Sequence, residues 1–186
     1  MSQEAREQLL RLVRERAFRQ GEFTLSSGET SDYYVDGKMI EVHPEGATLI
    51  GETIYDRIKD LSVNAIGGLA VGAVPLVTSA VISCYRHRLQ IEGFWVREEV
   101  KTHGTRKLIE GKLPGNARVV IVDDVITSGD SAQKAIDAVE AAGGKVVVIV
   151  ALVDRQRGAR EKFEKAGYVY DPLFTKDELF INEYAQ

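Results

Sequence analysis

Two adjacent carboxylates, Asp123 and Asp124, stand between an apolar run and a loop of small, hydroxyl-bearing residues. The apolar run, Val119–Val122, is mostly β-branched and predicts a strand that is buried on both faces. The loop, Thr127–Ser131, leads into Ala132–Ala142, where apolar residues follow a helical spacing. The predicted order is therefore strand, acidic pair, hydroxyl-rich loop and helix, with the acidic pair at the end of the strand.

This order suits a ligand that has both a phosphate group and free hydroxyls. Ligands of open parallel sheets bind beyond the carboxyl ends of the strands, and a helix N-terminus presents unpaired N–H groups to a phosphate. Thr127, Ser128 and Ser131 can add hydroxyl donors, whereas the two carboxylates would repel a phosphate set against them. A ribose 5-phosphate meets both conditions. The alternative is a buried strand before an ordinary capped helix, and the costly desolvation of two carboxylates argues against it.

The motif VVIVDDVITSGDS resembles the signature with which type I phosphoribosyltransferases bind 5-phosphoribosyl pyrophosphate (PRPP). A Walker A loop is excluded, because Gly-Lys-Ser/Thr is missing and the acidic pair is on the wrong side. The resemblance implies that the carboxylates hold the ribose hydroxyls and the loop holds the 5′-phosphate. The implied PRPP contacts in this segment are Asp123, Asp124, Val125, Ile126, Thr127, Ser128, Gly129, Asp130 and Ser131.

A second segment, REEVKTHG, starts at Arg97 and gathers cationic side chains with little apolar content. Taken alone, it is typical of a mobile surface loop with solvated charge. Beside the PRPP signature, it resembles the family's catalytic loop R-K-x-x-K-x-H-G, which closes over the pyrophosphate, although Glu98 stands where lysine is usual. The resemblance implies that Lys101 and His103 are catalytic and also bind PRPP, together with Arg97 and Glu98, in a mobile loop over residues 97–114.

Two glycine-containing segments extend the resemblance. The pattern F-x-L-x-S-G…Y-x-x-D within Glu22–Ile40 predicts a β-hairpin, and it resembles the N-terminal hood of orotate phosphoribosyltransferases. Many members carry lysine where this chain has Ser26. The second segment, Gly67–Pro75, is either a tight turn that needs positive φ or a close backbone approach to a ligand. The resemblance implies that this turn lies against the pyrophosphate, although the lysine that some members place there is absent.

Arg155 follows an apolar strand expected over Lys145–Val153. A salt bridge to Asp154 or Glu161 would be a structural role for its guanidinium. A bidentate guanidinium also suits a planar acid. The resemblance implies that Arg155, together with Thr127, binds orotate.

The chain has 186 residues, a formal net charge of −4 and one cysteine, Cys84. This length predicts a single domain, residues 1–186, and one cysteine excludes an internal disulfide. The acidic net charge argues against nucleic acid as a partner. No apolar run approaches the roughly 20 residues of a membrane span, and the first residues lack the apolar core of a signal peptide. We therefore expect a cytoplasmic protein with no membrane partner.

Apolar runs typical of strands alternate with helical patterns along the chain. Strands are expected at 63–67, 93–96, 119–122, 145–153 and 168–170, and helices at 4–19, 44–60, 76–85, 132–142, 159–166 and 175–184. This alternation predicts an α/β fold with a parallel central sheet flanked by helices. Residues 1–40 are expected to form a helix and an N-terminal β-ribbon hood on this type I phosphoribosyltransferase-like domain.

The resemblance as a whole implies transfer of the 5-phosphoribosyl group from PRPP to orotate, which gives orotidine 5′-monophosphate and pyrophosphate in pyrimidine biosynthesis. It also implies Mg²⁺ bridging the pyrophosphate and ribose oxygens, with no dedicated metal-binding residues, and a homodimer whose catalytic loop is shared between subunits. Two alternatives remain: an enzyme of the same fold that acts on another base such as a purine, and a PRPP-sensing regulator. The presence of Lys101 and His103 and the acidic net charge favour an enzyme.

Overall fold

The computed structural model describes residues 3–24, 28, 30–99 and 107–180. Its main sheet has the strand order β5-β4-β3-β6-β7-β8, in which β5 is antiparallel to β4 and the other neighbours are parallel. The strands are β3 (Ala65–Gly67), β4 (Glu92–Val96), β5 (Ile109–Gly111), β6 (Arg118–Ile126), β7 (Lys145–Asp154) and β8 (Phe174–Thr175). The predicted α/β fold with a parallel central sheet is confirmed.

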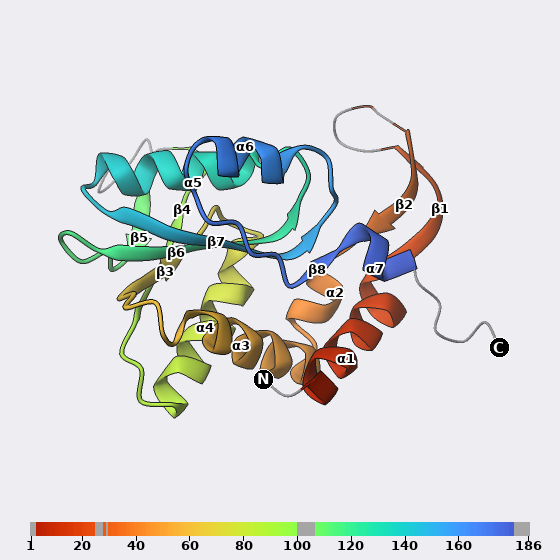
Figure 1. Cartoon of the computed structure of the whole chain (residues 1–186), viewed down its shortest axis with the longest axis horizontal. Coiled ribbons are helices and arrows are strands. Elements are labelled where there is room, and N and C mark those ends of the chain that lie inside the picture. The colour runs from red at the N-terminus through yellow and green to blue at the C-terminus, as the bar shows by residue number, and fades with distance from the viewer. Residues whose placement is uncertain (1–2, 25–27, 29, 100–106, 181–186) are drawn as a thin grey trace.

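Helices cover both faces of this sheet (Figure 1). One face carries α1 (Gln3–Leu12), α3 (Pro44–Ile58) and α4 (Ala73–Arg86), and the other carries α5 (Asp130–Ala141) and α6 (Ala159–Lys165). Side chains alternate along the central strand β6, so that its even-numbered valines join the first core cluster and Val119 and Ile121 join the second. No helix in the described part of the chain is both long enough and apolar enough to cross a bilayer.

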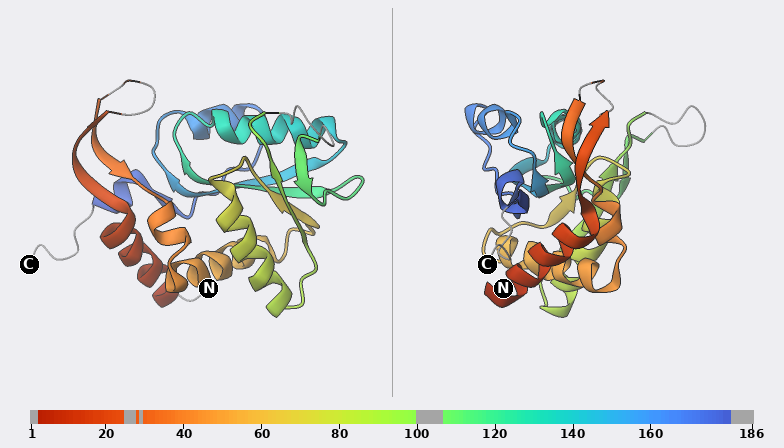
Figure 2. Two further views of the ribbon diagram at one scale, coloured as in Figure 1. Left: turned by 180° about the vertical axis from the view of Figure 1, so that it is seen from behind. Right: turned by 90° about the vertical axis from the view of Figure 1, so that its right-hand side faces the viewer.

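An antiparallel ribbon stands at one end of the main sheet (Figure 2). It consists of β1 (Phe18–Thr24) and β2 (Thr30–Val35), and α2 (Lys38–Glu41) follows it. The helix predicted to reach Arg19 ends earlier, in a π-helical turn over Val13–Ala17. Tertiary contacts explain the early end, because Phe18 pairs with Val35 and its ring packs against Tyr33 and Phe180.

Three other segments differ from the sequence-based expectations. The segment predicted as a loop, 97–114, contains the edge strand β5, which is too short to produce a periodic pattern. The strand expected at 168–170 is reduced to a single bridge between Tyr170 and Ile149. Helix α7 occupies Lys176–Phe180, and the remainder of the helix predicted over 175–184 lies outside the described residues.

Candidate active site

The acidic pair lies inside β6 and not at its end. Strand β6 continues to Ile126, which pairs with Asp154, because the neighbouring strand β7 is long enough to extend the ladder. The Asp123 carboxylate is buried and accepts a hydrogen bond from the N–H of Asp124 at 3.1 Å. Burial, followed by the charge of Asp124, raises the pKa of Asp123 to about 8.

The carboxylate of Asp124 is held between two glycines from distant parts of the chain. A Cβ atom at Gly72 would lie 2.7 Å from Oδ1, and one at Gly37 would lie 3.1 Å from Oδ2. Both glycines have helical φ values, −54° and −56°, so the site needs their small size and not their backbone freedom. From α2, the ammonium of Lys38 lies 3.5 Å from Oδ2 of Asp124.

The loop from Thr127 to Ser131 lines a cavity of about 100 Å³ next to Asp123. Gly129 has φ of 82°, and a Cβ there would come within 2.5 Å of the Phe163 ring, so both backbone and space require glycine. The first N–H groups of α5 have no partner within the helix. Lys162 pairs with Asp130 at 2.7 Å, which offsets the negative charge at this helix start and leaves the loop suited to a phosphate.

Arg155 lies immediately after β7 and is buried. Its Nε donates to the hydroxyl of Tyr33 at 3.0 Å, its Nη2 donates to Oγ of Ser31 at 3.1 Å, and the guanidinium stacks over the Tyr33 ring. The alternative salt bridge to Asp154 or Glu161 is not formed, and Arg155 has no ion pair among the described residues. Since an unpaired buried charge is costly, this arrangement favours a ligand that brings its own anion.

The turn Gly67–Pro75 connects β3 to α4 and packs tightly against the sheet. A Cβ at Gly68 would lie 2.0 Å from the carbonyl oxygen of Val122, and neither this glycine nor its neighbours in the turn have positive φ. Close approach, and not a positive φ, is therefore the reason for these glycines. The turn also lines a cavity of about 400 Å³ with Arg97 and Glu98, which brings the start of the predicted catalytic loop beside it.

Comparison with known proteins places this geometry in a family. The sequence model of the phosphoribosyl transferase domain matches residues 36–180. An orotate phosphoribosyltransferase from Nostoc sp. is 42% identical, in an alignment that covers 94% of this chain and 84% of the relative. The chain belongs to the orotate phosphoribosyltransferase family.

Solved structures of this family superpose on nearly the whole chain. The orotate phosphoribosyltransferase of Mycobacterium tuberculosis, in complex with Fe(III) dicitrate, has a TM-score of 0.84 at 37% identity, with 95% of this chain and 99% of that chain covered. The same enzyme in complex with PRPP has a TM-score of 0.80 at 34% identity, with the same coverage. The fold described above is therefore the fold of the orotate phosphoribosyltransferases.

The structure brings together part of the predicted family site. Asp123 and the loop from Thr127 to Ser131 share one cavity, which Val125 and Ile126 also line. Arg155 lies next to this cavity in the fold, because its N–H donates to the carbonyl of Ile126 at 2.9 Å. Arg97 pairs with Glu110 at 3.1 Å, and Glu98 is exposed. Lys101, His103 and Ser26 lie outside the described residues.

Sequence reasoning missed four residues that the structure adds to the surroundings of this site. Ser31 and Tyr33 hold the guanidinium of Arg155, and Lys38 and Glu41 lie around Asp124. The sequence contains a signal for the first two, because Ser31, Tyr33 and Val35 follow the two-residue spacing of a strand, and all three face inward in β2. No local pattern distinguishes Lys38 or Glu41 from the other charged residues of the chain.

Glu41 is a buried acid that differs from the other carboxylates near the site. It is 2% exposed, and neither carboxyl oxygen has a hydrogen-bond partner among the described residues. Burial, followed by the charge of Asp124, raises the pKa of Glu41 to about 8 from its ordinary value of 4.5. At neutral pH the Glu41 carboxyl is therefore mainly protonated in the folded protein and ionised in the unfolded chain.

This difference in protonation predicts that the unfolding free energy depends on pH, and that Glu41→Gln should make this dependence weaker. Because the folded pKa is raised, Glu41 favours folding below pH 4.5, and this contribution is lost as pH rises through about 8. One proton of difference between the two states changes the unfolding free energy by about 1.4 kcal/mol per pH unit at most. Urea unfolding at pH 5, 6.5 and 8 should show a shallower decline for Glu41→Gln than for the wild type.

The exposed residue Glu161 on α6 offers a matched control for this measurement. Glu161→Gln should keep the wild-type decline. Part of the slope should also persist in Glu41→Gln, because the pKa of Asp123 is raised to about 8 as well. An unchanged slope in Glu41→Gln would contradict the assignment of a protonated Glu41.

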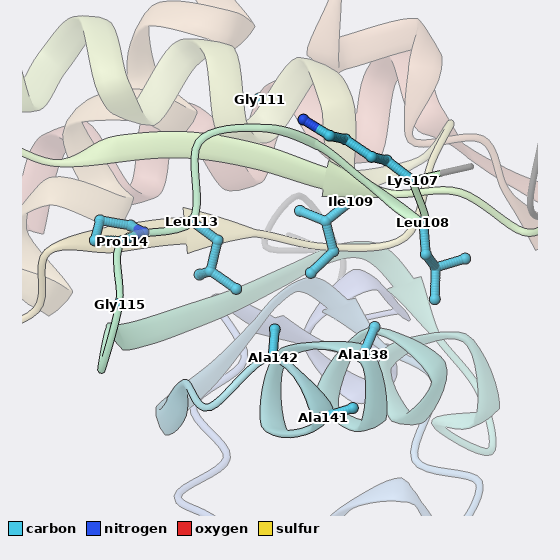
Figure 3. A pocket seen from close by; sticks show the side chains of 10 residues that line it. All are labelled: Lys107, Leu108, Ile109, Gly111, Leu113, Pro114, Gly115, Ala138, Ala141 and Ala142. Atoms are coloured by element: carbon cyan, nitrogen blue, oxygen red, sulfur yellow. The ribbon is translucent and has the colours of Figure 1, made fainter. Parts of the chain in front are cut away.

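A larger cavity of about 500 Å³ lies away from the acidic pair (Figure 3). Leu108, Ile109 and Leu113 form one wall, and small side chains at the end of α5, including Ala138 and Ala142, form the other. The cavity runs along the edge strand β5 beside α5, and neither the acidic pair nor the loop from Thr127 to Ser131 lines it. Ligands of parallel sheets bind beyond the carboxyl ends of the central strands, near those residues, so the larger cavity is not the candidate active site.

Proposed function

We propose that this protein transfers the 5-phosphoribosyl group from PRPP to orotate, giving orotidine 5′-monophosphate and pyrophosphate in pyrimidine biosynthesis. The observation that carries the proposal is Arg155, a buried guanidinium without an ion pair among the described residues, placed next to a ribose-phosphate cradle. The carboxylate of orotate supplies the missing anion in a geometry that a guanidinium binds well. Thr127, in the adjoining loop, completes the base contact.

The cradle positions the sugar. Asp123 and Asp124 accept hydrogen bonds from the ribose hydroxyls, and the loop from Thr127 to Ser131 binds the 5′-phosphate at the start of α5. Val125 and Ile126 complete this PRPP segment. Orotate then faces the anomeric carbon from the side of Arg155, which holds the two reactants in the geometry of attack.

The chemical step breaks the bond between the anomeric carbon and the pyrophosphate oxygen and forms a bond from that carbon to the orotate ring nitrogen. The nitrogen is already ionised, so no strong general base is needed. Negative charge increases on the departing pyrophosphate, and cations placed against it lower the barrier. We assign Lys101 to that role, with His103 and Arg97 assisting and Glu98 in the same loop. Closure of residues 97–114 would exclude water and protect PRPP from hydrolysis.

We expect Mg²⁺ to enter this site bound to PRPP, with most of its ligands supplied by the substrate. The described residues contain no group of three or more His, Cys, Asp or Glu side chains that could hold a metal ion. Oxygens of PRPP are therefore the expected ligands, as is common for Mg²⁺ bound with phosphates. Bound in this way, the ion would neutralise part of the pyrophosphate charge.

The remaining features of the proposal concern assembly and location. We propose a homodimer in which the loop at 97–114 of one subunit acts in the site of the other, and a single catalytic domain with residues 1–40 as its helix and hood. A cytoplasmic location agrees with the composition, including one cysteine, Cys84, which is buried and free.

The direct test is an assay of purified protein with orotate, PRPP and Mg²⁺, followed by loss of orotate absorbance. Adenine, hypoxanthine and uracil serve as parallel substrates. Loss of orotate alone, dependent on both PRPP and Mg²⁺, is the expected result. Turnover of a purine would keep the PRPP cradle and overturn the role of Arg155, and tight PRPP binding without turnover of any base would indicate a regulator.

A further inference from the structure

We propose that Lys38 binds the diphosphate of PRPP and the pyrophosphate product, as the cation that the Gly67–Pro75 turn does not provide. This inference rests on the proposed function. It concerns a residue that follows the hood pattern, two positions after Asp36, and that is not one of the residues specified by the quoted motifs. Four observations support it: the position of Lys38 beside Asp124, the stereochemistry of PRPP, the packing of the turn and the surplus of acids around this lysine.

The ammonium of Lys38 contacts one carboxylate, and most of the side chain is exposed. Its Nζ lies 3.5 Å from Oδ2 of Asp124, and 61% of its side chain is exposed. The charge of Asp124 is the main reason that the pKa of Lys38 is raised, so the side chain is cationic throughout the physiological range. A lysine held in this way keeps donors free for a second anion, because an ammonium has three N–H groups.

PRPP stereochemistry places its diphosphate close to this ammonium. In the α-anomer, the diphosphate at C1 lies on the same side of the ribose ring as the hydroxyls at C2 and C3. The acidic pair binds those hydroxyls in the proposed function. A cation that contacts the Asp124 carboxylate is therefore on the diphosphate side of the sugar.

The turn itself carries no cationic side chain. Its sequence, GGLAVGAVP, contains no lysine or arginine, and the space beyond Cα of Gly72 is filled by the Asp124 carboxylate. Arg97, which lines the cavity beside the turn, is paired with Glu110. Lys38 reaches the same carboxylate from α2, on the far side from the turn.

The charges around Lys38 also favour an additional cationic role. Its charged near neighbours are acidic: Asp124 is the main cause that raises the pKa of Lys38, and Asp36 raises it to a smaller extent, whereas Glu41 is mainly protonated at neutral pH. The C1 diphosphate of PRPP, which carries up to three negative charges, would be repelled by these carboxylates unless a cation lay between them. Lys38 occupies that position in the described structure, and Mg²⁺ carried by PRPP would share the neutralisation.

Isothermal titration of Lys38→Met tests the proposal with a pair of ligands that differ in one group. PRPP carries the diphosphate, whereas ribose 5-phosphate keeps the hydroxyls and the 5′-phosphate without it. Loss of one charge-assisted contact should weaken binding of Mg²⁺–PRPP and of Mg²⁺–pyrophosphate by about tenfold or more, with ribose 5-phosphate affinity unchanged. Lys38→Arg should recover most of the affinity, because it restores the charge.

Lys59→Met is a matched control, because Lys59 is an exposed lysine that also pairs with a carboxylate, Asp56 at 3.1 Å, at the C-terminal end of α3 and away from the cradle. It should bind all three ligands like the wild type. Equal losses for PRPP and ribose 5-phosphate in Lys38→Met would show that Lys38 only positions Asp124, and unchanged PRPP binding would show that it makes no contact; either result overturns the proposal. Failure of the proposed function is a separate outcome, seen as a wild-type protein that binds PRPP but does not consume orotate.

Discussion

Replacement of Arg155 by methionine should raise the KM for orotate by about a hundredfold or more, with PRPP affinity nearly unchanged. When a buried site pairs with a polar group of its substrate, loss of one partner leaves the other unpaired, and substrate binding can weaken by orders of magnitude. Arg155 donates to Tyr33 and Ser31, and no carboxylate of the described residues neutralises it, so the orotate carboxylate is its proposed partner. Steady-state kinetics with each substrate varied in turn measures this effect.

Two comparisons separate recognition from folding in this experiment. Arg160→Met removes an exposed arginine that pairs with Glu164, and it should leave both KM values unchanged. Tyr33→Phe keeps the charge of Arg155 but removes one acceptor, so its KM for orotate should rise less than that of Arg155→Met. If Arg155→Met weakened PRPP and orotate equally, the base contact would have to be assigned elsewhere.

Replacement of Lys101 by alanine should lower kcat by roughly a hundred- to a thousandfold, while PRPP still binds. One well-placed donor at a developing negative charge commonly contributes a factor of this size. Single-turnover kinetics and PRPP titration together measure the chemical step apart from binding. Lys145→Ala is the control, because Lys145 is an exposed lysine at the amino end of β7, at the end of that strand opposite Arg155.

A mixing experiment extends this result to the proposed dimer. In a heterodimer of Lys101→Ala and Arg155→Met subunits, a loop that crosses the interface would give one site with both residues intact and one site with neither. At an orotate concentration well below the KM of Arg155→Met, random mixing should then recover about a quarter of wild-type activity from two nearly inactive proteins. If the loop acts within its own subunit, mixing should recover no activity. In the single variant Lys101→Ala, an unchanged kcat would contradict the assignment of Lys101 to catalysis.

Residues within continuous motifs were predicted well from the sequence. The loop from Thr127 to Ser131 follows a buried strand and precedes a helix, as expected, because strand, loop and helix are adjacent in the chain. The position of Arg155 directly after an apolar strand was predicted for the same reason, and its role in orotate binding stays a prediction. The roles of Lys101 and His103 remain predictions, because both residues lie outside the described part of the chain.

Features that depend on distant partners could not be predicted. The contacts of Arg155 with Ser31 and Tyr33 span more than 120 residues, and the contact of Lys38 with Asp124 spans 86. The end of β6 is set by the length of its neighbour β7, and the first helix ends where Phe18 joins the ribbon. Local periodicity contains no information about these pairings, so tertiary structure decided each one.

The two glycines around Asp124 have a consequence for engineering the thermostability of this protein. Both adopt ordinary helical φ, where alanine usually stabilises a fold by about 0.4–1 kcal/mol because it restricts the unfolded chain. At Gly72 the added methyl group would instead meet the carboxylate proposed to hold the sugar, and at Gly37 it would meet the carboxyl of Glu41 and then Asp124. Alanine at these positions would therefore displace the acids of the site, so the usual stabilising replacement of helical glycines does not apply here.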